Sequence, residues 1–571
     1  MPTQVVVKQF ARIAGIIKDV NNHPLNSTQI QPIVKAAELF LNGFNHTPDI
    51  FSAQPYLYKS KYSYIDNLTF NSLVFCALLC KQNKVNELCS QQMLSSIISL
   101  YAERAALLTQ YYQQQGDAVT EHPYNKALIT LLQKVHLDVW YQGYGVFQLL
   151  CKEPSAIKKW PAQLTRVQRM VLCAHWLAVG VTHRTSGKSL SFAACLRQLT
   201  QLCPQHWIND LQPLLEYPGL VPPGTVIKYS GGQNAIVLGV TSERLLVNKL
   251  SKDKDQPVQF ARVYKTTEMQ PLGAQVIKGF SQTHNWWSEQ WQAEKADCIS
   301  PISESYPLNK PPPVLLEVQT HLNSGEVDID KLAVQISAEP AFSEYLKRTA
   351  TFSNRNKIPV QQVKHGLMMH GYLRTNNMLI EQALLLRLNQ SYFPLQQDFT
   401  QFTRLVAQIA FNLASHGNDI TPEQASNLAC FACSGLFTQP RLKTRTHWSP
   451  AQQNHYDLRS LYDFSHTDSL IEHGLILCKA WQQPGVFITA IQHLSTPPNE
   501  LKQTQLAKCL TCILGLSILA AKRAFFANLP QCTDSDNYIN QALEILAMSP
   551  TDYQHLSEQS LTQTHCYRTF H

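Results

Sequence analysis

Apolar residues recur every three to four positions over most of residues 27–215, and this spacing constrains the fold more than any other feature of the chain. Segments such as "IQPIVKAAELFLNGF" and "QRMVLCAHWLAVGV" would each keep one side of a helix apolar. Asn or Ser precedes several of these segments, where either residue can cap a helix. The pattern predicts helices throughout, with residues 1–60 as an N-terminal helical extension and 61–221 as a helical domain.

The pattern changes between residues 222 and 265, where β-branched residues replace the helical spacing. The stretch "PPGTVIKYSGGQNAIVLGVTSERLLVNKL" (222–250) carries Gly231-Gly232 between two short apolar runs, which predicts a hairpin. The stretch "PVQFARVYK" (257–265) predicts one more strand. We therefore expect a small β-meander module at 222–265, next to the first helical domain.

A second helical pattern extends from about 311 to 550. Residues 266–310 precede it, contain several prolines and lead into Pro311–Pro313, which is typical of a linker. The last residues, 551–571, are predicted to form a polar tail. The expected fold class is thus mainly α, with two helical domains and a small β-meander module between them.

Charge and hydropathy exclude several classes of partner. The 571 residues carry a net charge of only +8, without a run of Lys or Arg long enough for a nucleic-acid or membrane-binding stripe. No signal peptide is predicted, because lysine and arginine interrupt the apolar residues of the N-terminus. The longest apolar run is shorter than the roughly 20 residues of a membrane span. We therefore expect a cytoplasmic protein that binds neither nucleic acid nor a membrane.

Most of the fifteen cysteines lie in apolar, helix-like stretches, which predicts reduced and buried thiols. The pairs Cys430–Cys433 and Cys509–Cys512 have the spacing of zinc ligands. Their flanks, "SNLACFACSGL" and "LAKCLTCILGL", are apolar and lack the turn glycines of a zinc knuckle. Helices are therefore expected at both pairs.

Two long stretches of the second block follow a known pattern: "LAVQISAEPAFSEYLKRTATFS" (332–353) and "IPVQQVKHGLMMHG" (358–371). A third, "EHGLILCKAWQQPGVFITAIQHLSTPP" (472–498), follows later. Together they resemble an HDOD domain, a helical relative of the HD phosphohydrolases. The family's framework positions are here Pro340, Pro359, Gly371, Trp481 and Pro484. The resemblance implies an HDOD-like domain over 311–550 that acts in signal transduction through contacts with other proteins.

Two motifs of the first block, "CKEPSAIKKWP" (151–161) and "AHWLAVGVTHRTSGKSLS" (174–191), stand thirteen residues apart. They resemble, in length and order, the HHExxDGxGYP signature and the second motif of HD-GYP domains, a sister family. Glu153 and Pro161 coincide with the signature, and Trp160 replaces its tyrosine. The resemblance implies a degenerate HD-GYP-like domain at 61–221.

The metal ligands of these families are missing from the chain. Cys151 and Lys152 replace the paired histidines, Ala156 replaces the aspartate of the signature, and His175 replaces a later ligand aspartate. The HD dipeptide is expected within 94–108 and, in the second domain, at Thr438-Gln439, yet His-Asp occurs nowhere in the sequence. HD hydrolases use such ligands to hold the divalent metals that activate water. The chain is therefore predicted to bind no metal or cofactor and not to be an enzyme. The degenerate positions are Cys151, Lys152, Glu153, Ala156, Trp160, Pro161, His175, Thr438 and Gln439.

The predicted function is that of a non-catalytic regulatory scaffold of bacterial type, with signalling proteins as partners. Two alternatives stay open: a metal-dependent phosphodiesterase for cyclic dinucleotides with an atypical ligand set, and a non-catalytic cyclic-di-GMP receptor. The lysines at 152, 158 and 159 could attract such a nucleotide, although a solvated basic loop is the expectation. Trp160 and Trp176 are expected to be buried, because a fold kept without its metals must be held together by packing.

Overall fold

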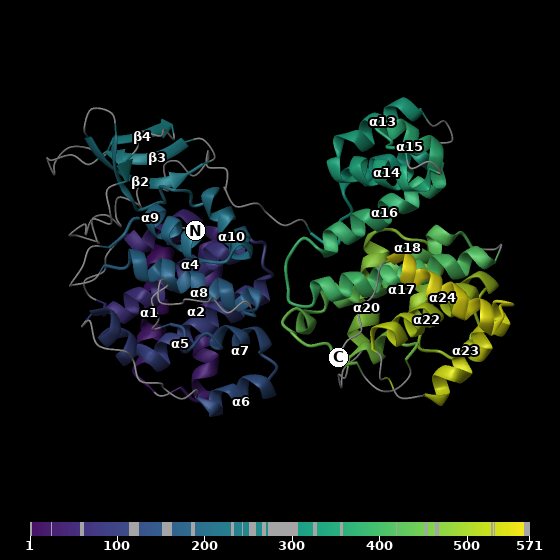
Figure 1. The fold of residues 1–571 in the computed structure, drawn as a ribbon, viewed down its shortest axis with the longest axis horizontal. Coiled ribbons are helices and arrows are strands. Elements are labelled where there is room, and N and C mark those ends of the chain that lie inside the picture. Colours follow the sequence, from purple (N-terminus) through teal and green to yellow (C-terminus); the bar gives the residue numbers. More distant parts are fainter. Residues whose placement is uncertain are drawn as a thin grey trace. The chain divides into compact units, whose positions relative to one another are not determined.

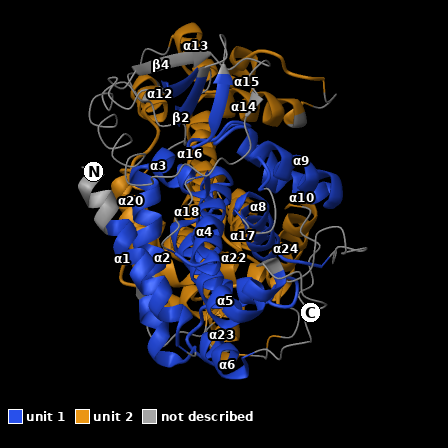
Figure 2. Cartoon of the chain, turned by 90° about the vertical axis from the view of Figure 1, so that its left-hand side faces the viewer, with its two compact units in different colours: residues 1–304 blue, residues 305–571 orange. Residues whose placement is uncertain are grey.

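The structure is a computed structural model in which two compact units, Met1–Glu304 and Ser305–His571, are distinguished (Figure 2). Both units consist mainly of helices, which confirms the mainly-α fold class (Figure 1). The residues that the structure describes are 3–23, 25–56, 62–113, 125–150, 163–183, 189–229, 233–241, 244–249, 259–264, 270–271, 307–323, 328–354, 358–417, 420–450, 455–462, 468–526, 529 and 532–564.

Unit 1 is built around α4, whose residues are almost all buried. Both α5 and α8 pack on α4, and α7 packs on α5 and α8. Several helices begin with a capping side chain: Ser63 starts α4 with a capping box, Asn125 caps α6 and Ser191 caps α9, whereas α8 is capped by Thr165 and α2 has no side-chain cap. The helices of this unit are α1 (Thr3–Asn21), α2 (Ile30–His46), α3 (Pro48–Ala53), α4 (Tyr64–Gln82), α5 (Glu87–Gln113), α6 (Lys126–Lys134), α7 (Asp138–Tyr144), α8 (Arg166–Val181), α9 (Phe192–Leu202) and α10 (Gln205–Leu211).

The helices within residues 1–60 are part of this bundle. α1 packs on α2, and both contact α5. Phe10 of α1 is buried, and its ring lies 4.5 Å from that of Phe51, centroid to centroid. The extension at 1–60 and the domain at 61–221 therefore share one core within unit 1.

Unit 1 also contains an antiparallel sheet with the strand order β4-β3-β2-β1-β5. The predicted hairpin is confirmed by the pairing of β1 with β2, in which Val226 lies opposite Ile236, while Gly231-Gly232 lie outside the described residues. The strand predicted within 257–265 is also confirmed, as β4. The strands are β1 (Val226–Tyr229), β2 (Gln233–Val240), β3 (Arg244–Lys249), β4 (Gln259–Tyr264) and β5 (Gln270–Pro271).

The expected linker at 266–310 lies mostly outside the described residues. Two of its stretches are described, 270–271 and 307–310, and the first differs from the prediction, because Gln270–Pro271 is β5 and pairs with the edge of β1. A proline fits there, since an edge strand does not need every N–H of its backbone.

A buried carboxylate joins the helices of unit 1 to the sheet. Asp49, in the first turn of α3, accepts a hydrogen bond from the Tyr217 hydroxyl at 2.8 Å and another from the backbone N–H of Val240 in β2. Gly239 allows this approach, because a Cβ there would lie 3.2 Å from the Asp49 carboxylate. Burial raises the pKa of Asp49 to about 7 although both hydrogen bonds act to lower it.

This raised pKa makes the stability of unit 1 depend on pH. The folded chain keeps the Asp49 proton up to about pH 7, whereas the unfolded chain loses it near pH 4. Between these values the folded state binds more protons, so the free energy of unfolding should fall as pH rises, by on the order of 1 kcal/mol per pH unit. Urea denaturation at several pH values measures this slope. Asp49→Asn should flatten it; an unchanged slope in this variant would contradict the prediction.

Unit 2 consists of two groups of helices joined through α16. α12 to α15 pack on one another and on α16, and α16 also packs on α18, which belongs to a second group around α17 and α22 (Figure 1). The helices are α12 (Pro313–Asn323), α13 (Ile329–Ala338), α14 (Pro340–Ser353), α15 (Val363–His370), α16 (Tyr372–Leu388), α17 (Gln396–His416), α18 (Pro422–Cys433), α19 (Gly435–Thr438), α20 (Asp468–Ala480), α21 (Gly485–Gln492), α22 (Gln505–Phe525), α23 (Thr533–Ile545) and α24 (Pro550–Thr564).

The framework residues of the second block lie at helix boundaries. Pro340 is the first residue of α14, Gly371 joins α15 to α16 with φ of 76°, and Pro484 precedes α21. A positive φ of this size favours glycine. Trp481 is buried, and its Nε1 donates to the Leu308 carbonyl oxygen at 3.0 Å.

The polar tail expected from residue 551 differs in the structure, because α24 is a helix that packs on α17. Tyr553 and Ser560 are its buried residues, two turns apart. The Tyr553 hydroxyl donates to the Leu516 carbonyl oxygen of α22 at 3.0 Å, and the Ser560 hydroxyl accepts from the Asn412 side chain of α17 at 2.8 Å. Two residues on one side of the helix are enough to anchor it, although its mean composition is polar.

The two CxxC pairs lie in helices, as predicted. Cys430 and Cys433 are buried in α18, and Cys509 and Cys512 are buried in α22. Burial raises the pKa of the Cys433 and Cys512 thiols to about 12, so both stay protonated at neutral pH. Among the described residues, α22 is the one helix long and apolar enough to cross a membrane by composition, but 78% of that stretch is buried inside the structure.

Candidate functional site

The degenerate positions fall into three places. The whole first motif, 151–161, lies outside the described residues, and His175 of the second motif lies in α8 of unit 1. Thr438 and Gln439 lie at the end of α19 in unit 2. The positions outside the described residues are Cys151, Lys152, Glu153, Ala156, Trp160 and Pro161.

His175 is only 1% exposed, and both of its ring nitrogens have hydrogen-bond partners. Nε2 lies 2.8 Å from the Leu150 carbonyl oxygen, and Nδ1 lies 2.5 Å from the Tyr101 hydroxyl of α5. A carbonyl oxygen can only accept, so Nε2 carries the hydrogen and Nδ1 accepts from Tyr101. The Tyr101 oxygen lies 2.6 Å from the Ser72 hydroxyl of α4, which extends the chain of hydrogen bonds. This chain links the three central helices of unit 1.

The His175 ring is neutral in this environment. Burial lowers its pKa to about 4, against the raising effect of its hydrogen bond to Leu150. A metal needs a ring nitrogen whose lone pair is available. Here Nε2 is protonated and the lone pair of Nδ1 faces the Tyr101 hydroxyl. The ring therefore joins α8 to α5 and to the Leu150 carbonyl oxygen by hydrogen bonds.

The stretch expected to hold the HD dipeptide, 94–108, belongs to α5 and supplies mainly neutral groups to the interior. The Ser99 hydroxyl accepts from the Trp140 indole N–H at 2.9 Å. Arg104, one turn after Tyr101, is buried, and its guanidinium lies 3.6 Å from the centre of the Phe147 ring. Arg104 thus adds a buried permanent positive charge to this part of α5, and such a charge opposes the binding of a divalent cation nearby.

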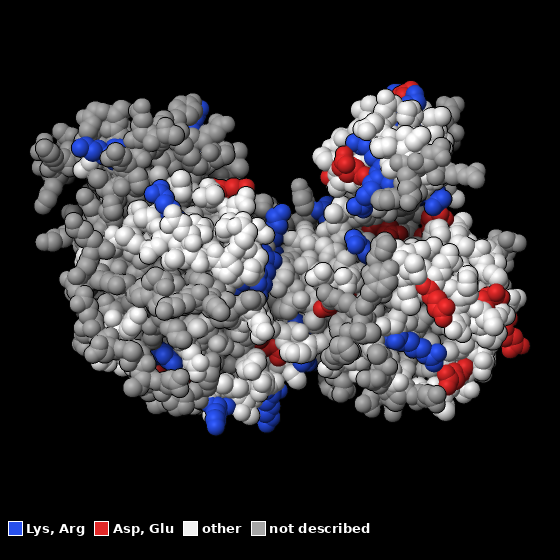
Figure 3. All heavy atoms as spheres, viewed as in Figure 1, with Lys and Arg blue, Asp and Glu red and all other residues white. Residues whose placement is uncertain are grey.

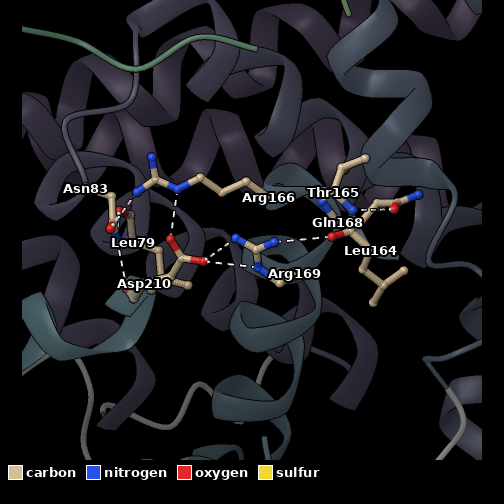
Figure 4. A network of polar contacts seen from close by, with 8 residues as sticks. All are labelled: Leu79, Asn83, Leu164, Thr165, Arg166, Gln168, Arg169 and Asp210. Carbon is tan, nitrogen blue, oxygen red and sulfur yellow. Dashed lines mark hydrogen bonds and ion pairs between the residues drawn. The ribbon is translucent and has the colours of Figure 1, made fainter. Parts of the chain in front are cut away.

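Sequence reasoning missed a cluster of charges where α4, α8 and α10 meet (Figure 4). Arg166 Nε lies 2.8 Å from one Asp210 carboxylate oxygen, and an Arg169 terminal nitrogen lies 3.1 Å from the other. Arg166 also donates to the Asn83 side chain at 2.9 Å. Both carboxylate oxygens are engaged by arginine, so the cluster fastens the helices and offers no free acid or base. The sequence signal for this cluster was the pair Arg166 and Arg169, three positions apart at the start of α8.

In unit 2, Thr438, where the HD dipeptide was expected, has hydrogen-bond partners for its hydroxyl. The Thr438 hydroxyl oxygen lies 2.9 Å from His473 Nδ1 and 3.1 Å from the Ser434 carbonyl oxygen. Burial lowers the pKa of His473, which favours its neutral form. Within the described parts of both units, no three His, Cys, Asp or Glu side chains are grouped as metal ligands.

A pocket of about 450 Å³ in unit 2 was also missed. One side of α14 supplies most of its wall, and the segment before α15 and one residue of α16 complete it. The lining residues of α14 recur every three to four positions, so they share one side of the helix. Most of them are polar, where a helix packed in the core would have apolar residues. This pattern was the sequence signal for the pocket. The lining residues are Ala341, Glu344, Tyr345, Lys347, Arg348, Thr351, Val360, Gln361 and Gln382.

Four exposed apolar residues lie within six positions of the sequence where α15 meets α16, and we name these four the corner cluster: Met368, Met369, Tyr372 and Leu373. Met368 and Leu373 are the most exposed, at 66% and 63%. Gly371 lies between the two pairs, and its conformation ends α15 and begins α16. The cluster is thus held by two helix ends.

No protein-family model matches the chain, and no curated protein matches it. Similar solved structures include a putative phosphohydrolase from Shewanella amazonensis SB2B, with 16% identity over 45% of this chain and 90% of that one and a TM-score of 0.32. An HDOD domain protein with unknown function from Geobacter sulfurreducens has 13% identity over 48% of this chain and 98% of that one, with a TM-score of 0.33. A response regulator from Methylococcus capsulatus has 18% identity over 44% of this chain and 98% of that one, with a TM-score of 0.24.

Proposed function

We propose that the chain is a non-catalytic regulatory protein that binds signalling proteins through the corner cluster of unit 2. The observation that carries the proposal is the exposure of four large apolar side chains within six residues: 66% for Met368, 45% for Met369, 40% for Tyr372 and 63% for Leu373. Single exposed apolar residues are common on protein surfaces, but a contiguous group of them marks an interaction site.

The chemistry of the corner cluster fits the apolar face of an amphipathic helix in the partner. Methionine is unbranched and flexible, so neighbouring methionines can adapt to differently shaped apolar surfaces. Tyr372 adds a ring that has an apolar body and a polar tip. Helices that lay an apolar face on such surfaces are a common form of recognition.

Ion pairs on either side fasten the corner to the rest of unit 2. Lys364 Nζ, one turn before Met368, lies 2.6 Å from the Asp330 carboxylate of α13. Arg374 Nε, directly after Leu373, lies 3.2 Å from the Glu423 carboxylate of α18. These contacts hold both helix ends before a partner arrives, which lowers the entropy lost on binding.

The absence of catalysis is supported by the chemistry at the two ligand positions. His175 uses both ring nitrogens in hydrogen bonds, and Arg104 brings a positive charge one turn from its partner Tyr101. In unit 2, Thr438 offers a hydroxyl that His473 and Ser434 already contact. We also place the protein in the cytoplasm, because α22, the one described helix long and apolar enough to cross a membrane, is mostly buried in unit 2.

Replacing two corner-cluster residues with aspartate should abolish partner binding. In the full chain, the double variant M368D/L373D puts two charges where an apolar helix would dock, so the affinity should fall at least about 100-fold. The measurement is capture of partners from native lysate, followed by titration of each captured protein. Ile476→Asp is the matched control, because Ile476 is an exposed residue of α20, at 59%.

The control should bind as the unchanged chain does, and all proteins should unfold at similar temperatures, since exposed substitutions change stability little. Unchanged binding by M368D/L373D would contradict the proposal. The proposal would also be contradicted if the only effect of the double variant were to convert a dimer to a monomer. The corner cluster would then bind a second copy of the chain and not a signalling protein.

A further inference from the structure

The pocket between α14 and α16 contains polar groups that no other described residue satisfies. The Tyr345 hydroxyl, the Arg348 guanidinium and the side-chain amides of Gln361 and Gln382 all line it. None of the four makes a hydrogen bond or ion pair with another described side chain or backbone group. Polar groups that converge on one cavity in this way are typical of a ligand site.

The walls of this pocket are already in place. The Thr351 hydroxyl donates to the Lys347 carbonyl oxygen at 2.7 Å and accepts from the Val360 N–H at 2.9 Å. The second bond fixes the segment before α15 against α14 and thereby positions Gln361. Gln382 comes from α16, which packs directly on α14.

The pocket carries one positive charge that is not neutralised. Lys347 Nζ lies 3.0 Å from the Glu344 carboxylate, so these two charges offset each other. Arg348 has no such partner, and its guanidinium lies 5.9 Å from the centre of the Tyr345 ring. On the face of the molecule shown in Figure 3, Lys and Arg atoms gather on the part of unit 2 that contains α13, α14 and α15.

The Tyr345 hydroxyl is available as a hydrogen-bond donor to a ligand. Burial raises the pKa of its phenol, and the charge of Glu381 raises it further. The Glu381 carboxylate itself is held by the Ser426 hydroxyl of α18 at 2.9 Å. The phenol therefore keeps its proton at neutral pH and can donate a hydrogen bond to an anion.

We propose that this pocket binds a phosphate monoester of a small polar metabolite. A guanidinium, a phenol and two amides together offer more donors than a carboxylate can accept, and they match the three terminal oxygens of a phosphate. The volume of about 450 Å³ exceeds that of a phosphate group and leaves room for the organic part. This site is separate from the corner cluster and does not depend on the function proposed above.

Calorimetric titration of the full chain tests this assignment, with inorganic phosphate, ribose 5-phosphate, ribose and acetate as probes. Both phosphates should bind, ribose 5-phosphate more tightly, and ribose and acetate should not. Arg348→Gln should weaken the binding of ribose 5-phosphate at least about 10-fold, and Tyr345→Phe about 3- to 10-fold. Arg441→Gln removes the same charge from an exposed arginine outside the pocket and should change the affinity less than about twofold.

The assignment is wrong if neither phosphate binds at millimolar concentration, or if Arg348→Gln binds as the unchanged chain does. It is also wrong if Arg441→Gln causes an equal loss, which would indicate general charge attraction, or if acetate binds as tightly as phosphate. The M368D/L373D variant should keep its affinity for ribose 5-phosphate. Failure of the pocket and failure of the corner cluster are therefore distinguishable.

Discussion

Replacing His175 with aspartate is expected to destabilise unit 1 strongly, although aspartate is the residue that the HD-GYP pattern has at this position. The carboxylate could not donate to the Leu150 carbonyl oxygen, and burial would oppose its charge. We expect the free energy of unfolding of unit 1 to fall by about 3–5 kcal/mol, as when a buried charge has no partner. Urea denaturation, with hydrogen exchange of α4, α5 and α8 to localise the change to unit 1, measures this loss.

His175→Gln is the matched control, because its amide stays neutral and can still donate to a carbonyl. It should cost only about 1–2 kcal/mol. Neither protein should be stabilised by added Mn²⁺ or Zn²⁺. If Mn²⁺ bound His175→Asp with one-to-one stoichiometry and restored its stability, a metal site would have survived in unit 1, and the non-catalytic proposal would be contradicted.

Trp176→Ala should have a comparable effect on unit 1. Trp176 is 5% exposed in α8, as predicted, and Trp160 lies outside the described residues. Truncating a buried tryptophan leaves a cavity in a close-packed core, so the free energy of unfolding should fall by about 3–5 kcal/mol. The same denaturation measures it.

Leu220→Ala serves as the control, because Leu220 is 53% exposed and its truncation should change stability by less than about 0.5 kcal/mol. A loss below about 1 kcal/mol for Trp176→Ala would show that the packing around α8 collapses to fill the space, and that this tryptophan does not hold the bundle together.

The parts of the fold that could be predicted are those with a strong local signal. Periodicity over tens of residues marks the helices, and two glycines between β-branched runs mark the β1–β2 hairpin. β5 and α24 have no such signal. β5 is two residues long and forms because β1 has a free edge, and α24 is held by Tyr553 and Ser560 against helices far away in the sequence.

The sequence marks the position of His175 but not its surroundings. Its two partners, Tyr101 and Leu150, lie 74 and 25 residues away, so the neutral hydrogen-bond chain exists only once α4, α5 and α8 have packed. The corner cluster could not be predicted from the sequence either, for the same reason. "HGLMMHGYL" has the composition of an ordinary helix, and only the packing of α15 and α16 decides which of its residues stay exposed.

Helix α22 has a consequence for how the chain is made in the cell. Its composition would suit a lipid bilayer, yet it must find its place among α17, α18, α21 and α23. α17 and α18 precede it in the sequence, and domains fold from the N-terminus as they are synthesised. When α22 leaves the ribosome, α17, α18 and α21 have therefore already been translated, and of these four neighbours only α23 still follows. The order of the helices shortens the time in which an apolar segment could be diverted to a membrane or to aggregation.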